Sequence, residues 1–373
     1  MKLQYSFKQF QSTKEIIDFL NLFEIYRTSF FTSKTWISQW LRHSQSTGNK
    51  YYLIFFHNNK PVGIAIFNEV KKTRRHFFKT TLLSMHDNDI DRYNFSIEYN
   101  EILADPAFIK PAINSLLLFL SSRKKFNEIQ INGATHTSFT LLSEVIHNHS
   151  NLKLITEEVS TCRLVNLKDF PDFLTYHKFL SKKRKYQLRK SEENYNQYGE
   201  IEASVANNTQ EAIKFFDELG VLHEKKWNTK GLKGAFSNKI WVDFHKDIIS
   251  ESFNQGKIIL FKLSAGDTTI GILYIFNDLN KASVIQTGFL YDTSKYSQPG
   301  FLTHYYFIKY ALSMNISEYN FLAGDSPYKK SLSTNSENLF WLTIQKKSLK
   351  FRIENLLLNI KRKVYDSIRL KLQ

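Results

Sequence analysis

Two segments of the chain share one pattern of apolar and polar positions. They are YYLIFFHNNKPVGIAIFNEV from Tyr51 and KIILFKLSAGDTTIGILYIFND from Lys257. In each, β-branched and aromatic residues flank a short turn containing Asn or Gly, and the second run opens with an aliphatic residue and a glycine, at 62–63 and 270–271. This pattern predicts two β-hairpins.

The two segments are followed by a second matching pair. Helical spacing at 111–123 leads into FNEIQINGA, and helical spacing at 301–314 leads into ISEYNFLAGD, with Glu128 and Glu318 at equivalent places. The chain therefore reads as a duplicated unit of hairpin, further strands, helix and strand, with a period near half its length. Two α+β domains of unrelated origin are the alternative.

These patterns predict a mixed α/β (α+β) fold in two domains, each a mostly antiparallel mixed sheet flanked by helices. The boundary is expected near 160–170, where NLKDFPDFLTYHKFL brings turn residues before a basic helical segment. We assign residues 1–165 to the first domain and 166–345 to the second. Residues 346–373 form a basic amphipathic C-terminal helix by their spacing.

Composition supports two hydrophobic cores and a location inside the cell. The chain has 373 residues, of which 42% are hydrophobic and 15% aromatic, enough to bury a core in each half. The N-terminus lacks a signal pattern, and the longest strongly apolar run, at 116–120, is too short to cross a bilayer. Cys162 is the single cysteine, which excludes an intramolecular disulfide and any cysteine-based metal cage. We expect a cytoplasmic protein.

The charge points to an anionic partner without naming it. Lys and Arg number 51 against 35 Asp and Glu, a net charge of +16. Much of the excess lies in clusters at 182–190 and 346–371. Nucleic acid, an anionic membrane face, a phosphorylated cofactor and a lipid-linked glycan are all attracted by such charge. The tail is either a membrane-surface helix or a helix packed on the second domain with a solvated basic face.

A first candidate site is the sequence QPGFL, made of Gln298, Pro299, Gly300, Phe301 and Leu302. Proline suits a first helical turn, and a helix N-terminus offers unpaired N–H groups to a pyrophosphate. A glycine at the second position would let the ligand approach the backbone. An ordinary loop-to-helix junction is the alternative.

A second candidate site is YNFLAGDSPYKKSL, where a predicted strand runs into a Gly-Asp turn. Tyr328 is a candidate to protonate a leaving thiolate, and Lys329 a candidate to hold an anionic group. We expect Asp325 and Lys329 to contact the substrate. Solvent-facing loop residues of these types are equally common.

A third candidate site surrounds His223 and Glu224, near the end of a predicted helix that starts at Thr209. Either residue is a candidate base for an acceptor amine or hydroxyl. Trp227 and Phe236 suit stacking on a sugar or lining an acyl channel. A lone histidine is more often structural.

Taken together, these regions resemble the CelD-type acetyltransferase-like proteins, a branch of the GNAT superfamily related in layout to the Fem peptidyltransferases. The resemblance covers most of the chain and is clearest at 179–332. It rests on KKRKYQLRK, on Leu222-His223 with Trp227, on GAFSN, on QPGFL and on GDSPYKK. In the first half it rests on FFTSKTWISQWL and the first hairpin.

The resemblance implies tandem GNAT-like domains, with acyl-CoA (acetyl-CoA above all) as co-substrate and no metal. The second half would then hold the donor, and the cleft between the halves the acceptor. The sequence departs from the family at two points. The phosphate loop is reduced to 298–300, and Asn320 stands where many relatives have an aspartate.

Searches for other motifs are negative. The segment HDNDIDRYNFSIE places Asp87, Asp89, Asp91 and Glu98 at EF-hand ligand spacing, but Arg92 occupies the position that needs glycine. The sequence contains no Walker loop, dinucleotide fingerprint, HExxH motif or serine-hydrolase elbow.

Three functions stay open from the sequence. The leading one is acyl transfer from acyl-CoA to an amine or hydroxyl of a sugar or envelope polysaccharide precursor. A Fem-like transferase that uses aminoacyl-tRNA fits the +16 charge. A non-catalytic scaffold at the inner membrane face would use the basic tail, and attachment by the tail is also compatible with catalysis.

Overall fold

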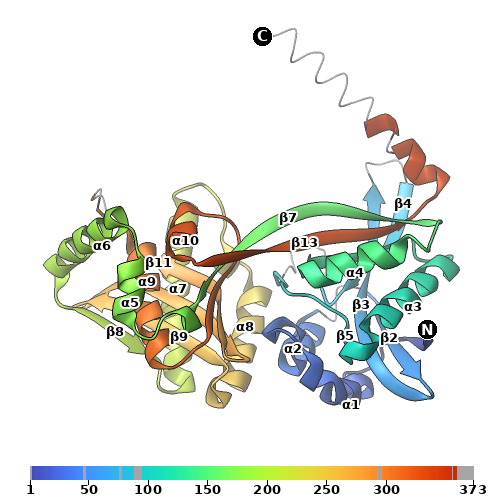
Figure 1. The fold of residues 1–373 in the computed structure, drawn as a ribbon, viewed down its shortest axis with the longest axis horizontal. Coiled ribbons are helices and arrows are strands. Elements are labelled where there is room, and N and C mark those ends of the chain that lie inside the picture. Colours follow the sequence, from blue (N-terminus) through green and yellow to red (C-terminus); the bar gives the residue numbers. More distant parts are fainter. Residues whose placement is uncertain are drawn as a thin grey trace, which may run out of the picture.

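The computed structural model describes residues 2–44, 48–74, 78–87, 95–291, 294, 296–354 and 356–358. Within them the chain builds two lobes joined by two long strands (Figure 1). One continuous sheet runs through both lobes in the order β1-β2-β3-β4-β6-β13-β7-β12-β11-β10-β9-β8, with β5 beside β3.

The first half contains the first predicted hairpin, β2–β3, whose strands pair antiparallel. Ser33 caps α2 by accepting from the Trp36 N–H, which explains why the helix begins there. Its elements are β1 (Gln4–Gln9), α1 (Lys14–Phe23), α2 (Lys34–His43), β2 (Lys50–His57), β3 (Lys60–Arg74), β4 (Phe78–Met85), β5 (Leu103–Ala104), α3 (Ile109–Ser122), β6 (Glu128–Ala134), α4 (His136–Ile146) and β7 (Leu152–Asn166).

The second half contains the other predicted hairpin, β9–β10, also antiparallel. Asn208 and Asn238 cap α7 and α8 through their side chains. Its elements are α5 (Phe173–Phe179), α6 (Lys182–Tyr195), β8 (Ile201–Val205), α7 (Thr209–Asn228), α8 (Lys239–Ser252), β9 (Ile258–Ala265), β10 (Thr268–Asp278), β11 (Lys281–Phe289), α9 (Pro299–Ser313), β12 (Glu318–Ala323), α10 (Pro327–Leu332) and β13 (Asn335–Lys346).

The two halves repeat one topology. In each, a hairpin is followed by a third antiparallel strand, a helix, and a strand that pairs parallel with the third. Glu128 opens β6 opposite Leu82, and Glu318 opens β12 opposite Lys281. The structure thus contains the repeat expected from the sequence, and the mostly antiparallel mixed sheet with flanking helices confirms the predicted fold class.

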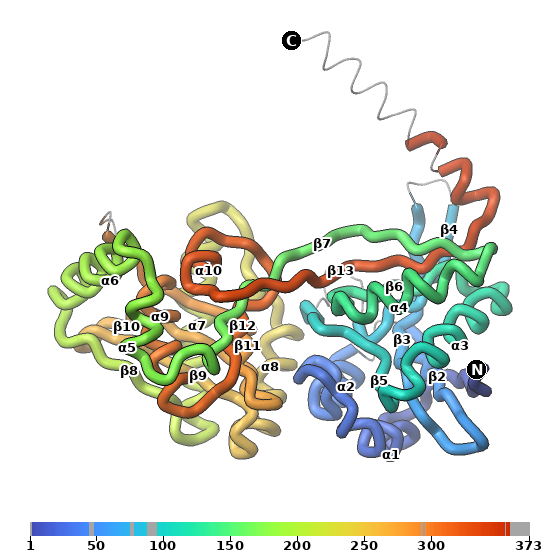
Figure 2. Tube along the Cα trace, viewed as in Figure 1, coloured from blue at the N-terminus to red at the C-terminus, as the bar shows by residue number. Residues whose placement is uncertain are grey.

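The halves exchange their last strands (Figure 2). β7 leaves the first half and pairs with β12 of the second, whereas β13 returns and pairs with β6 of the first. β7 and β13 also pair with each other along their length, from Asn335 opposite Leu164 to Lys346 opposite Leu152. The proposed boundary at 165/166 stays a prediction. β13 belongs to the second half by its place in the sequence, but it pairs with β6 of the first half.

Aromatic side chains also join the halves. Trp36 of α2 meets Phe244 of α8 edge to face, with ring centres 4.9 Å apart, within a cluster of buried residues that both halves share. Arg27 and Asp278 form an ion pair of 2.6 Å beside it. Because both the sheet and this cluster cross the boundary, the halves are held together by apolar burial as well as by backbone pairing.

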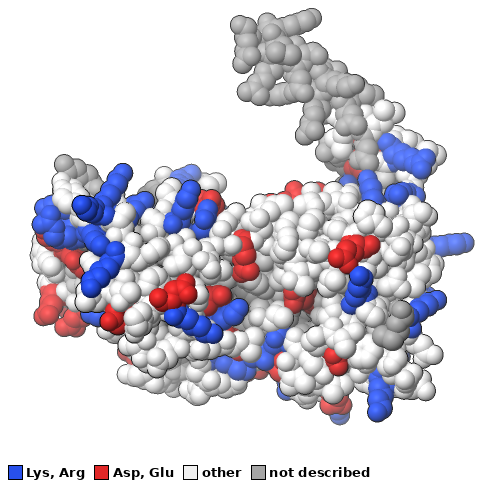
Figure 3. All heavy atoms as spheres, viewed as in Figure 1, with Lys and Arg blue, Asp and Glu red and all other residues white. Residues whose placement is uncertain are grey.

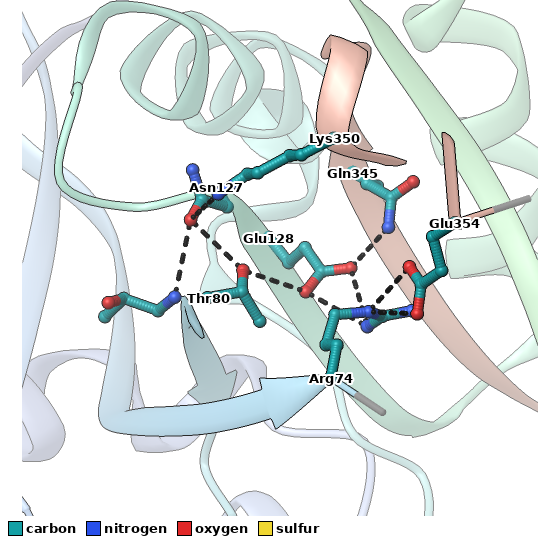
Figure 4. A network of polar contacts seen from close by, with 8 residues as sticks. Arg74, Thr80, Asn127, Glu128, Gln345, Lys350 and Glu354 are labelled. Carbon is teal, nitrogen blue, oxygen red and sulfur yellow. Dashed lines mark hydrogen bonds and ion pairs between the residues drawn. The ribbon is translucent and has the colours of Figure 1, made fainter. Parts of the chain in front are cut away.

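The C-terminal segment packs on the first half (Figure 4). Arg74 Nε donates to the Glu354 carboxylate at 2.9 Å, and Nη1 donates to Glu128 at 3.3 Å. Gln345 Nε2 donates to the same buried Glu128 at 2.5 Å. One of our two sequence interpretations had the tail helix packed on the second domain, and the described part, 349–354 and 356–358, instead lies against the first.

In the part of the chain that the structure describes, no helix is long and apolar enough to span a membrane. The remainder of the predicted tail helix, 359–373, lies outside the described residues.

Candidate active site

β11 and β12 pair only over their first residues and then separate. The parallel pairing runs from Lys281 opposite Glu318 to Ser283 opposite Asn320, although β11 continues along β10 as far as Phe289. A register shift in the β10–β11 pairing leaves an extra residue on β11, a β-bulge. The second part of β11 therefore presents backbone groups that β12 does not cover.

Thr287 shows how that uncovered edge is used. Its C=O accepts from His223 Nδ1 at 3.3 Å, and its N–H donates to the side-chain oxygen of the neighbouring Gln286 at 3.0 Å. Neither hydrogen bond joins Thr287 to the backbone of a neighbouring strand. A ligand carbonyl can therefore replace the Gln286 oxygen at this N–H without breaking the sheet.

The N-terminus of α9 lies just beyond β11 and has no side-chain cap. Gln298 stands at the cap position, and its C=O accepts from the Leu302 N–H at 3.0 Å. Tyr195 of α6 ties the approach to this helix by donating to Leu290 O at 2.9 Å and sharing a 2.8 Å hydrogen bond with Ser297. The first N–H groups of an α-helix lack intrahelical acceptors, so they are available to an anion here.

A cation stands over the same helix turn. The Arg184 guanidinium of α6 lies 5.6 Å from the centre of the Phe301 ring. In Figure 3, lysine and arginine gather at the end of the molecule where Figure 1 places α6. The unpaired N–H groups of α9 and the basic helix thus combine into one region of positive potential.

Gly300, Phe301 and Leu302 are buried, and the last two belong to a cluster of buried apolar residues. A Cβ added to Gly300 would stand 3.0 Å from the Phe289 ring. The glycine thus admits a phenylalanine where the sequence interpretation expected it to admit a ligand. Only the backbone N–H groups of these residues are placed to meet an anion.

Tyr328 stacks on His304, with ring centres 5.3 Å apart and an interplanar angle of 15°. His304 is fully buried, and its Nδ1 lies 2.6 Å from the Tyr319 hydroxyl, while its Nε2 has no partner among the described residues. Burial lowers the pKa of His304 to about 3, so the ring is neutral. Burial raises the pKa of Tyr328 to about 12, which keeps its hydroxyl protonated at neutral pH.

Lys329 and Asp325 have partners within the fold. The Lys329 ammonium donates to Phe321 O at 2.8 Å and to Ala323 O at 2.9 Å, and thus closes the end of β12. Arg163 of β7 binds the Asp325 carboxylate through two nitrogens, at 2.8 and 3.1 Å. This geometry gives both side chains a structural use, and their predicted contact with substrate stays a prediction.

His223 and Glu224 hold the loop that contains GAFSN. His223 Nε2 accepts from the Ala235 N–H at 3.4 Å, which leaves Nδ1 as the donor to Thr287 O. Glu224 accepts from the N–H groups of Gly234 and Phe236, both at 3.1 Å. Burial lowers the pKa of His223, so it is neutral at pH 7. Of the two, the half-exposed Glu224 keeps free lone pairs.

Phe236 and Trp227, the aromatic pair near this loop, are both partly exposed. Phe236 lies against Gly220, where an added Cβ would meet the ring at 2.6 Å, and thus belongs to the packing of α7. Trp227 is half-exposed next to His223, with ring centres 6.0 Å apart. Phe236 is thus held by packing on α7, whereas Trp227 lies beside the His223 ring.

A third set of contacts links α7 to α10 near the end of β11. Lys226 of α7 donates to the Tyr291 hydroxyl at 3.3 Å, and Tyr291 interacts electrostatically with Tyr328. The three sequence-predicted regions, around His223, Gln298 and Tyr328, are therefore brought to one place. Sequence reasoning did not single out Arg184, Tyr195 or His304, because a basic cluster and an aromatic helix give no sign of which member faces the strand.

At the junction between the halves, the end of β12 is tied to the first half. Asn320 Nδ2 donates to the Tyr99 hydroxyl at 2.5 Å, and Tyr99 donates to Glu337 at 2.5 Å. Glu98 accepts from the Ala323 N–H at 2.9 Å, and burial raises the pKa of its carboxyl to about 7. The cavity beside Asn320 and Tyr99 has a volume of about 40 Å³.

Metal ligation finds no support in the described residues, which contain no group of three or more His, Cys, Asp or Glu arranged to hold an ion. Asp89 and Asp91 of the EF-hand-like segment lie outside the described residues.

Residues 182–330 match the family model of the acetyltransferase (GNAT) domain. The matched segment of the second half is therefore similar to the GNAT acetyltransferase domain. This makes the protein a transferase. The match covers α6 to α10 and so includes the β11–β12 separation and the α9 N-terminus. No curated protein matches the sequence significantly.

Solved structures share the fold over most of this chain. The crystal structure of FemX has 10% sequence identity and a TM-score of 0.57, over 91% of this chain and 97% of its own. A conserved protein of unknown function from Bacteroides thetaiotaomicron has 11% identity and a TM-score of 0.55, over 91% and 100%. The C-terminal domain of a putative lysylphosphatidylglycerol synthetase from Agrobacterium fabrum has 9% identity and a TM-score of 0.52, over 93% and 95%. At these identities the likeness concerns the fold.

Proposed function

We propose that this GNAT domain transfers an acyl group from acyl-CoA to an amine or hydroxyl of a sugar or envelope polysaccharide precursor, as CelD-type relatives are expected to do. The observation that carries the donor assignment is the uncapped N-terminus of α9, next to the uncovered edge of β11 and beneath Arg184. A pyrophosphate fits unpaired helix N–H groups and a nearby guanidinium. The acyl thioester would then extend along the β11 edge.

The reaction follows from the groups at that edge. The acceptor nitrogen or oxygen attacks the thioester carbon while the Thr287 N–H takes the carbonyl oxygen in place of Gln286. The C–S bond breaks, and the thiolate takes a proton from the Tyr328 hydroxyl. Glu224 takes the acceptor's proton, and it is preferred to His223 because both histidine nitrogens already have partners. Trp227 supplies an apolar face for the acceptor.

Calorimetric titration of the purified protein with acetyl-CoA and longer acyl-CoA thioesters tests the donor. We expect at least one thioester to bind, with an affinity that falls as the salt concentration rises, because the site is cationic. Absence of binding by every thioester at low salt would reject acyl-CoA as the donor.

A Fem-like transferase that uses aminoacyl-tRNA is the second candidate, and the exposed basic face of α6 favours it. Lys182, Lys183 and Arg189 of that helix are exposed to solvent. Neutralisation of nucleic-acid phosphates by such residues gives affinity that falls steeply with salt. Filter binding of tRNA at increasing salt tests this candidate, with the unmodified protein compared to a variant that carries both Lys182→Glu and Lys183→Glu. If the variant binds tRNA as tightly as the unmodified protein, this face of α6 is not the tRNA-binding site.

We also propose that the tail attaches the enzyme to an anionic membrane surface, where lipid-linked acceptors lie. Leu349, Ile353 and Leu356 are 72%, 50% and 60% exposed on successive helix turns, with the basic Lys347 and Arg352 beside them. An apolar face with basic flanks favours binding in the headgroup region. Phe351 and Glu354 anchor the opposite face to the first half.

A further inference from the structure

A cavity of about 240 Å³ lies in the first half, between β4, α3, β6 and α4. By chain order these elements correspond to β11, α9, β12 and α10 of the second half, where the aromatic rings around His304 pack. Four almost fully buried apolar side chains form its floor, and three exposed residues stand at its mouth. The floor consists of Met85, Ile113, Ile131 and Leu142, and the mouth of Thr28, Pro106 and Thr137.

A carboxylate stands where this cavity meets solvent. Glu101 Oε2 accepts from the Thr28 hydroxyl at 2.8 Å, and Oε1 accepts from the hydroxyls of Thr135 and Ser138. A carboxylate has about four lone-pair sites, so these contacts leave room for one more donor. Among the described residues that line the cavity, Glu101 carries the one formal charge.

The turn that leads into α3 has a capping carboxylate, which the start of α9 lacks. Asp105 precedes the helical turn that leads into α3, and its Oδ1 accepts from the Ala107 N–H at 2.9 Å. Gln298 makes no such contact at α9. α3 itself begins at Ile109 without a side-chain cap. The Asp105 carboxylate at the turn before it and the Glu101 carboxylate in the cavity are both negative, and they disfavour a pyrophosphate at this end of the first half.

We propose that this cavity binds a primary alkylamine, with its chain on the apolar floor and its ammonium group against Glu101. The volume equals about eight groups of the size of a water molecule, at about 30 Å³ each, so a chain of six carbons fits. An apolar pocket with one placed charge is the usual form of a small-molecule site. The site is separate from the donor site and does not rest on the proposed acyl transfer.

The test is calorimetry at pH 7 with hexylamine as the probe, and with 1-hexanol and hexanoate as matched neutral and anionic chains. We expect hexylamine to bind at least ~10-fold more tightly than hexanol, equal to about 1.4 kcal/mol, and hexanoate not to bind. Glu101→Gln keeps the shape of the side chain and removes its charge. In this variant hexylamine should lose that advantage and hexanol should bind as before.

Leu141→Trp provides a second, independent variant, because Leu141 lines the cavity and is partly exposed, so a larger side chain fills the space from the surface. It should abolish binding of hexylamine and hexanol alike, with the thermal unfolding temperature maintained.

Equal affinity for hexylamine and hexanol, or binding that survives Leu141→Trp, overturns the proposal. Competition by acetyl-CoA that strengthens in Glu101→Gln also overturns it, and would identify a second thioester site instead. Loss of acyl-CoA turnover in an enzyme that still binds hexylamine bears only on the proposed function.

Discussion

The guanidinium of Arg184 lies over the ring of Phe301, 5.6 Å from its centre, at the first turn of α9. The contact fixes one cation of the basic helix α6 beside the unpaired N–H groups of α9. We predict that Arg184→Ala weakens acyl-CoA binding by about tenfold, roughly 1.4 kcal/mol, and that the loss shrinks at high salt. Arg189→Ala is the control, because Arg189 is an exposed residue of the same helix that pairs with Glu193. Calorimetry that finds equal losses in the two variants would show that only the overall charge of α6 matters.

Gln298 at the start of α9 differs from Asp105, which caps the turn before α3. Gln298→Asp gives α9 the capping carboxylate that Asp105 provides near α3. A side-chain cap stabilises a helix by about 0.5–2 kcal/mol, so the variant should unfold at the same or a higher temperature. Its carboxylate nevertheless occupies the anion position, and acyl-CoA affinity should fall at least ~10-fold.

Gln298→Asn is the matched control for that experiment, because it caps with the same shape and no charge. Donor affinity should stay close to that of the unmodified protein. If both variants bind acyl-CoA equally well, the pyrophosphate does not lie at the N-terminus of α9.

Tyr328→Phe tests the proposed general acid. The ring still stacks on His304, so the fold and the donor KM should be unchanged, whereas kcat should fall about 100-fold or more because the thiolate leaves unprotonated. Tyr306→Phe removes a hydroxyl of α9 that donates to Glu192, and it should leave kcat unaltered. Steady-state kinetics with both variants distinguishes a chemical role of Tyr328 from a packing role.

Glu98 should make stability depend on pH. Its folded pKa of about 7 exceeds the ordinary value of 4.5, so the folded state holds the proton more tightly than the unfolded chain. The stabilisation is complete below pH 4.5 and is lost as pH rises towards 7, by about 3 kcal/mol. Denaturant unfolding of Glu98→Gln and the unmodified protein across this range should show the variant gaining relative stability as pH rises. A constant difference between them would mean that Glu98 does not titrate in this window.

Leu349→Ser, Ile353→Ser and Leu356→Ser together test the membrane proposal. The three side chains are exposed in the described structure, so folding should be unaffected, and co-sedimentation with phosphatidylglycerol vesicles should drop several-fold. Ile25→Ser removes an equally exposed apolar side chain from the first half and should change nothing. Binding to neutral phosphatidylcholine vesicles as strong as to anionic ones would contradict the role of the basic flanks.

Much of the fold follows from local pattern. Both hairpins, the helix–strand pairs after them and the equivalence of Glu128 and Glu318 depend on periodicity within short segments, which sequence records directly. The exchange of β7 and β13 was beyond such reasoning, because a strand's own residues do not specify which of two similar sheets it joins.

The candidate site divides in the same way. The sequence identified the residue types near the site at QPGFL, at Tyr328 and at the His223 loop, because glycine, proline and polar residues after a strand mark turns and helix starts. It did not reveal that Gly300 lies against the Phe289 ring, or that the Lys329 ammonium donates to the backbone carbonyls of β12.

The sequence by itself thus determined the repeated unit and the basic helix α6, and it predicted that the chemistry lies in the second half. Only the tertiary structure decided that Arg184 stands over α9, that Glu224 rather than His223 keeps free lone pairs, and that the first half contains an apolar cavity closed by Glu101. The reason is physical: hydrogen-bond partners and empty space arise between segments distant in the chain, and local periodicity carries no information about them.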